Sequence, residues 1–134
     1  MFFNKNDEEN DLAKIAALLI YAAKIDQNYS DSEEKIIKQA LIQFGAKESN
    51  INEIINLGKE IENNSNQILD FTKKVKSMDD KNKIKIIETL WRIIYSNKEA
   101  DIYETNLMRR LGGLLYIDNK LMGDIKVKIK KEFL

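Results

Sequence analysis

Apolar residues recur at helical spacing along almost the whole chain, and their pattern predicts seven helices. Between residues 8 and 24 the apolar positions cover most of the circumference of a helix, which is typical of a helix at the centre of a core. The segment that begins at Asp79 or Asp80 and contains Trp91 has the same character. The five other predicted helices carry narrower apolar stripes. The second spans residues 31–44, the third follows Ser49 or Asn50, and the fourth follows Ser65. The sixth begins near Asp101, and the seventh runs from Asp118 towards Phe133.

Polar residues and glycines mark the ends of these helices. Ser, Asn and Asp at the predicted starts can accept hydrogen bonds from the free N–H groups of a first turn, and Gly45 is a natural stop for the second helix. Gly112 and Gly113 fall inside the sixth helix, where close helix packing or an early helix end would explain them. The only near-alternation of the kind found in strands, at residues 125–129, also fits a helix. The pattern therefore predicts an all-α fold.

The length and composition fit one domain and restrict its chemistry. With 134 residues, 43% of them hydrophobic and 33% charged, the chain can build a core beneath a solvated surface. We expect a short polar lead at residues 1–10 and a single helical domain over residues 11–134. The chain has no Cys and no His, which excludes thiolate catalysis and removes the commonest general base. A carboxylate-based hydrolase is therefore the least favoured function.

Charge is balanced overall but unevenly distributed along the chain. Residues 1–70 hold 7 Lys and 13 Asp or Glu, whereas residues 71–134 hold 15 Lys or Arg and 9 Asp or Glu. We expect two solvated faces of opposite sign, and the alternative is a basic surface for phosphate or acidic lipid. The start of the chain has no signal-peptide pattern, and no apolar run approaches the ~20 residues that a membrane helix needs. A cytoplasmic location is expected.

A shift of 71 residues superimposes the two halves of the chain at low identity. It places Asp26 on Asn97, and Glu33 on Glu104. In both copies an apolar helix enters a short polar loop, and a carboxylate follows near the start of the next helix. The repeat predicts that the first and fifth helices are central and are related by a pseudo-twofold axis.

These residues resemble the TerB-like tellurite-resistance family of small seven-helix bacterial proteins. The family pattern is an apolar helix ending in Ala-Asp-Gly and then a helix-starting Glu, and it occurs twice, here at residues 25–34 and 90–104. The family's Leu-Trp-Arg is kept at residues 90–92, its Tyr-Glu at 103–104 and its Arg-Arg-Leu at 109–111. The resemblance implies an all-α, seven-helix fold, divalent-metal binding at acidic positions, and a stress response linked to the membrane.

The four polar residues aligned by the repeat are the candidate metal ligands: Asp26, Glu33, Asn97 and Glu104. Oxygen ligands from two loops that meet could hold Ca²⁺ or Mg²⁺. The alternative is structural, because a carboxylate in a first turn bonds free N–H groups, and Asp or Asn can tie down its own loop.

This chain departs from the family pattern in both loops. Gln27 and Lys98 stand where the family has glycine, and Asn97 stands where it has its second Asp. Gly in such loops commonly supplies a positive φ at little steric cost. The site would lose one negative charge and gain a positive charge nearby, which disfavours a metal ion.

The remaining motifs have simple structural interpretations. Trp91 is expected in the core, and the lysines of the last helix look like its solvated side: Lys126, Lys128, Lys130 and Lys131.

The leading functional hypothesis is a non-catalytic, stress-associated domain that binds a protein partner, tuned by a divalent ion. A homodimer and weak attachment to an anionic membrane surface are alternatives, and nucleic acid is less favoured as a partner.

Overall fold

The computed structural model describes residues 5–25, 29–65, 68–96 and 102–133, and these residues form helices joined by short turns. None of the helices in these ranges is long and apolar enough to cross a membrane. The all-α prediction is confirmed. The helices are α1 (Lys5–Ala23), α2 (Asp31–Gln43), α3 (Ile51–Asn63), α4 (Ile68–Lys76), α5 (Asp80–Tyr95), α6 (Ile102–Leu114) and α7 (Asn119–Lys131).

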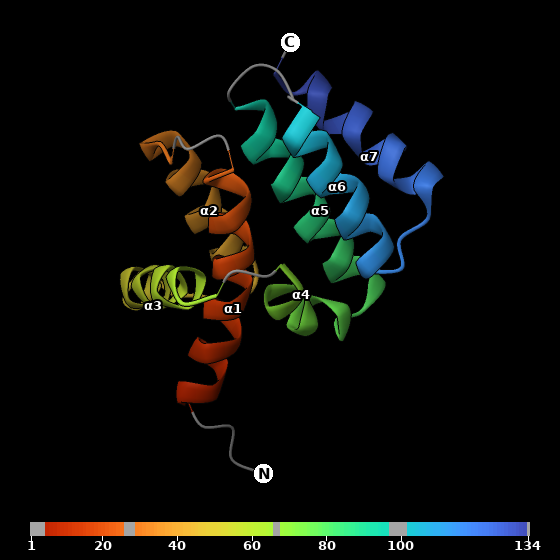
Figure 1. Cartoon of the computed structure of the whole chain (residues 1–134). Helices are drawn as coiled ribbons and strands as arrows, with labels where there is room; N and C mark the ends of the chain where they lie inside the picture. The colour runs from red at the N-terminus through yellow and green to blue at the C-terminus, as the bar shows by residue number, and fades with distance from the viewer. Residues whose placement is uncertain (1–4, 26–28, 66–67, 97–101, 134) are drawn as a thin grey trace.

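Helices α1 and α5 form the centre of the molecule, as their apolar circumference predicted. Helix α1 packs against α2, α3, α4 and α5, whereas α5 also packs against α7. In Figure 1, α2 and α3 lie with α1 in one half, α6 and α7 lie with α5 in the other, and α4 lies between them. Every residue from 15 to 20 is buried, and Trp91 is only 4% exposed. Helix α1 begins at Lys5, so part of the expected polar lead is helical.

Gly58 allows α3 to pack closely against α1. A Cβ atom at this position would lie 2.8 Å from the Cβ of Ala16 and 3.2 Å from the carbonyl oxygen of Ala13. Real side-chain atoms do not approach so closely, so only glycine fits here without a shift of backbone. The small residues of α1 therefore face a small residue of α3.

The predicted capping interactions hold at some helix starts and are wrong at others. Asp79 caps α5, because its carboxylate accepts a hydrogen bond from the Asn82 N–H at 2.9 Å. Asn50 precedes α3 without capping it, since its side-chain oxygen accepts from the Lys47 N–H at 2.8 Å instead. Asp118 precedes α7 and makes no side-chain cap either. At Asn50, the N–H group of the preceding turn thus competes with the first N–H groups of α3 for the same side-chain oxygen.

Helix α7 is fastened to α5 by two ion pairs between residues 40 positions apart. Arg92 contacts Glu132 through Nε to Oε2 at 2.9 Å and through Nη2 to Oε1 at 3.1 Å. Lys128 contacts the Glu88 carboxylate at 2.9 Å. Residues 125–129 lie within α7, so the near-alternation in the sequence belongs to a helix.

Candidate functional site

Glu33 and Glu104 are the two acidic residues buried in the described part of the chain. Glu33 is 1% exposed and Glu104 is 4% exposed. Each is the third residue of its helix, Glu33 in α2 and Glu104 in α6. The first turns of both helices lie towards the same end of the molecule in Figure 1. Both glutamates selected from the sequence are therefore buried in the first turn of a helix, whereas an ordinary carboxylate lies on the surface.

The Glu33 carboxylate closes a capping box at the start of α2. The Ser30 backbone N–H and the Ser30 hydroxyl both donate to Oε1 of Glu33 at 2.9 Å. In return, the Glu33 N–H donates to the Ser30 hydroxyl oxygen at 3.2 Å. Such contacts offset the cost of burying a carboxylate and satisfy free N–H groups of the helix. This geometry supports the structural interpretation of Glu33.

A second polar group ties the start of α2 to α3. The Tyr29 hydroxyl donates to Oε1 of Glu34 at 3.2 Å, and Lys59 from α3 contacts the same oxygen at 3.0 Å. Burial, together with the Glu34 charge, raises the pKa of the Tyr29 phenol well above its ordinary value. The hydrogen bond from Lys59 lowers the pKa of Glu34. The start of α2, next to the first candidate loop, is therefore joined to α3 by the contact between Glu34 and Lys59.

The other two candidate ligands, Asp26 and Asn97, lie outside the described residues, as do Gln27 and Lys98. Within the described ranges, no group of three or more acidic residues is placed to hold a metal ion. Glu104 has polar partners of its own. A Ca²⁺ or Mg²⁺ site at these four positions thus stays a prediction.

The lysines of α7 divide into engaged and free side chains. Lys128 is paired with Glu88 at 2.9 Å, and the Lys126 ammonium lies 5.4 Å from the centre of the Trp91 ring. Lys130 and Lys131 are exposed and form no ion pair with a described residue. An anionic surface would therefore meet two unpaired lysines at the C-terminal part of α7.

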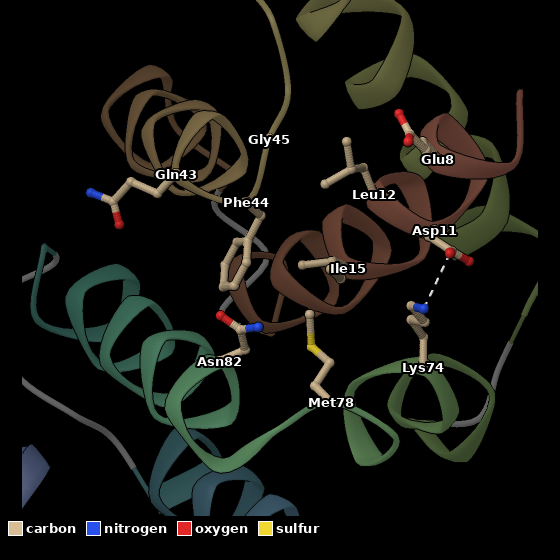
Figure 2. A pocket seen from close by; sticks show the side chains of 10 residues that line it. All are labelled: Glu8, Asp11, Leu12, Ile15, Gln43, Phe44, Gly45, Lys74, Met78 and Asn82. Carbon is tan, nitrogen blue, oxygen red and sulfur yellow. Dashed lines mark ion pairs between the residues drawn. The ribbon is translucent and has the colours of Figure 1, made fainter. Parts of the chain in front are cut away.

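A cleft of about 530 Å³ lies where α1, α4, the end of α2 and the start of α5 meet (Figure 2). We call it the interhelical cleft. Its floor is apolar and consists of Leu12, Ile15, Phe44 and Met78. Its rim is largely polar and consists of Glu8, Asp11, Gln43, Gly45 and Lys74, whereas Asn82 reaches into the cleft. Figure 2 shows Ile15, Phe44, Met78 and Asn82 converging on the centre of this space.

The rim of the interhelical cleft carries an excess of negative charge. Lys74 Nζ contacts Oδ2 of Asp11 at 3.1 Å across the cleft, so these two charges offset one another. Glu8 is exposed and pairs with no described cation. The C-terminal end of α2, at Phe44 and Gly45, also faces the cleft, and the dipole at that end of a helix favours a cation.

The sequence did not reveal this cleft, because its walls come from segments far apart in the chain. Asp11 and Lys74 belong to α1 and α4, and neither stands in a recognisable motif. The only local signal was Gly45, which correctly predicted where α2 ends.

Comparison with known families completes the picture of the whole chain. The family model described as "Tellurite resistance protein TerB" matches residues 12–126, which include all of α2 to α6 and most of α1 and α7. No curated protein and no solved structure matches the chain significantly. Because the family model covers far more than half of the sequence, and the helices follow the order implied by the resemblance, the chain belongs to the TerB tellurite-resistance family.

Proposed function

We propose that this TerB domain is non-catalytic and acts in a stress response by binding a protein partner, and that the interhelical cleft receives a basic segment of that partner. One observation carries the proposal: an open cleft of about 530 Å³ combines an apolar floor with an acidic rim. A lysine or arginine side chain suits such a site, because its alkyl stem packs on apolar surface while its charged end reaches the rim.

Three features of the rim favour a cation over an anion. Glu8 pairs with no described cation, Asp11 is held by a lysine that an incoming cation could replace, and the end of α2 contributes a negative dipole. Residues 1–70, which provide most of the cleft, also carry the acidic excess of the chain. Electrostatic complementarity of this kind speeds association and selects partners more than it adds affinity.

A pair of matched peptides tests the proposal. An amphipathic peptide of alternating Leu and Lys should shift the NMR signals of Ile15, Phe44 and Met78 saturably, and added salt should weaken the effect. A Leu and Glu peptide of the same length should not. The double variant Glu8→Gln with Asp11→Asn should lose the response, whereas Glu53→Gln, at an exposed site on α3, should keep it. Equal shifts from both peptides, or no saturable shift, would rule out the cleft as the partner site.

A divalent cation is a second candidate ligand, favoured by the matching burial of Glu33 and Glu104. On this hypothesis a cation held by these residues with Asp26 and Asn97 would tune partner binding. The capping box at Glu33 argues for a weak site, since one oxygen of that carboxylate already accepts two hydrogen bonds. Thermal unfolding with Mg²⁺ or Ca²⁺ and then with chelator tests it: a chelator-reversible rise in melting temperature would support the ion.

A further inference from the structure

Trp91 is buried, yet its indole N–H has no hydrogen-bond acceptor within the described part of the chain. A buried donor without a partner destabilises the fold, and few such groups occur in native structures. The ring is also held in place, because it stacks on Tyr95 with the centroids 5.7 Å apart and the planes at 22°. The indole therefore offers a fixed donor that no described residue uses.

Trp91 also lines a small pocket of about 160 Å³ between α5, α6 and α7. We call it the Trp91 pocket. Its polar side chains include Arg109 from α6, and Asn119 and Lys126 from α7. Among the described residues, no aspartate or glutamate lines it. The pocket thus has a positive charge excess, in contrast to the interhelical cleft.

The two cations of the Trp91 pocket are not neutralised by described residues. Arg109 is exposed and forms no ion pair with them, and Lys126 contacts only the face of the Trp91 ring, with Nζ 5.4 Å from its centre. The neighbouring basic residues differ, since Arg92 pairs with Glu132 and Lys128 with Glu88. Unpaired positive charge is therefore concentrated beside the unused indole donor.

The remaining wall of the pocket is apolar and adaptable. Met108 and Met122 are buried there, and methionine side chains adjust readily to a guest. Gly123 lines the pocket within α7, where a Cβ atom would meet nothing within 4 Å. Packing therefore does not require glycine at this helical position, although glycine is less favourable than alanine within a helix. Its absent side chain leaves the pocket open.

We propose that the Trp91 pocket binds a small organic anion. The carboxylate of the anion faces Arg109 and Lys126 and accepts a hydrogen bond from the Trp91 N–H. The apolar part of the anion packs against Met108 and Met122. Because the indole nitrogen is shielded from water in the free chain, a side chain that lines the pocket must move before the ligand reaches it. The volume suits a single ring or a branched acyl group, since pockets for drug-sized ligands measure roughly 300–1,000 Å³.

The chain contains one tryptophan. The fluorescence of this tryptophan and its indole N–H signal in NMR spectra therefore report on this pocket. The probe is benzoate, and the matched neutral control is benzamide. We expect benzoate to change the fluorescence saturably and to shift the indole N–H signal, with benzamide binding about tenfold more weakly or less. Arg109→Gln and Lys126→Gln should each weaken benzoate binding by about tenfold, typical of losing a charge-assisted contact.

Lys130→Gln is the control variant, because Lys130 is exposed on the same helix outside the pocket, and it should leave benzoate affinity unchanged. A short peptide ending in phenylalanine, with a free or an amidated C-terminus, separates two sources of the carboxylate. Tighter binding of the free-acid peptide than of benzoate assigns the pocket to a chain terminus, and weaker binding assigns it to a free small acid. Absence of a saturable benzoate response, equal binding of benzamide, or indifference to both charge-removing substitutions overturns the proposal.

Discussion

Gly45 and Tyr116, which lie 71 residues apart, adopt left-handed backbone conformations at the same place after α2 and α6. Their φ angles are 112° and 57°, and among the described residues no others have positive φ. In both places the N–H groups of the left-handed residue and of the next one donate to carbonyls three and five residues earlier, at 2.9–3.3 Å. This is the Schellman arrangement of a helix end. The match supports the 71-residue repeat, although the twofold relation itself stays a prediction.

Replacing Gly45 by alanine should destabilise the fold by about 1 kcal/mol, because an L-residue is strained at positive φ. Space is not the reason, since a Cβ atom there would meet nothing within 4 Å. Urea unfolding followed by circular dichroism measures the change. Gly113→Ala is the matched control: it also has open space, lies inside α6, and should be neutral or stabilise by up to ~1 kcal/mol. Equal losses in both variants would contradict the conformational explanation.

Gly58→Ala should destabilise for a different reason, namely overpacking between α3 and α1. The added methyl carbon would lie 2.8 Å from the Ala16 Cβ, so the helices must separate, at a cost of about 1–3 kcal/mol. The same unfolding experiment measures this cost. A second substitution, Ala16→Gly, should restore part of the stability in the Gly58→Ala background because it removes the opposing atom. Purely additive losses would place the strain elsewhere.

Trp91→Ala should lower the free energy of unfolding by about 3–5 kcal/mol, as expected for emptying a large buried site. Trp91→Phe should cost less, since it keeps an aromatic ring and removes an N–H that bonds no described residue. Circular dichroism must follow both transitions, because neither variant contains tryptophan. If Trp91→Ala melted within about two degrees of the parent chain, the side chain would contribute little to the core.

The pH dependence of stability should be flat between about pH 6 and 8, because the chain has no histidine.

On the acid side, Lys59 lowers the pKa of Glu34 from its ordinary 4.5. The unfolded chain then binds the proton more readily, so this contribution is present above pH 4.5 and is lost as pH falls through the folded pKa. Glu34→Gln should therefore flatten the acid limb of a plot of stability against pH. An unchanged acid limb would show that Glu34 does not contribute.

On the alkaline side the sign reverses. Burial raises the pKa of Tyr29 above its ordinary 10.0, so the folded chain keeps the phenol protonated where the unfolded chain releases it. Stability should accordingly fall as pH rises beyond about 10. Tyr29→Phe removes this group and should reduce the alkaline loss, as measured by urea unfolding at pH 8 and above pH 10. Tyr103→Phe, at a site 70% exposed, serves as the control.

The helices could be predicted from the sequence because each one carries its own burial pattern. The all-round apolar character of residues 15–20 and of the Trp91 segment was sufficient to place α1 and α5 at the centre. Side-chain caps were less predictable: Asn50 fits the start of α3 by residue type, but the preceding turn also offers an N–H, and the side chain bonds there. Such a choice depends on a balance of two similar hydrogen bonds.

The candidate sites were harder to predict because they depend on contacts between distant segments. Glu33 and Glu104 could be selected by the repeat, yet nothing in a glutamate's residue type predicts burial. The Asp11–Lys74 pair that spans the interhelical cleft joins α1 to α4, and no local pattern relates them. Tyr116 gave no signal either, since left-handed helix ends usually carry glycine or asparagine.

The paired loops allow a gain-of-function test of the metal hypothesis. Asn97→Asp combined with Lys98→Gly restores the family pattern in the second loop, adding a carboxylate and removing an adjacent cation. If Glu33 and Glu104 share a site with these loops, the double variant should bind Ca²⁺ or Mg²⁺ measurably more tightly than the parent chain, which we expect to bind weakly or not at all.

If the glutamates are helix braces instead, the same double variant should change stability without any dependence on the ion. Glu33→Gln and Glu104→Gln should then each cost about 0.5–2 kcal/mol, typical of losing a cap, and their effects should add because the two helix starts act independently. Calorimetric titration of the parent and restored chains decides between the two. Since the restored chain has the full set of family carboxylates, its failure to bind either ion would end the metal hypothesis, whereas the capping box at Glu33 would still explain why that carboxylate is buried.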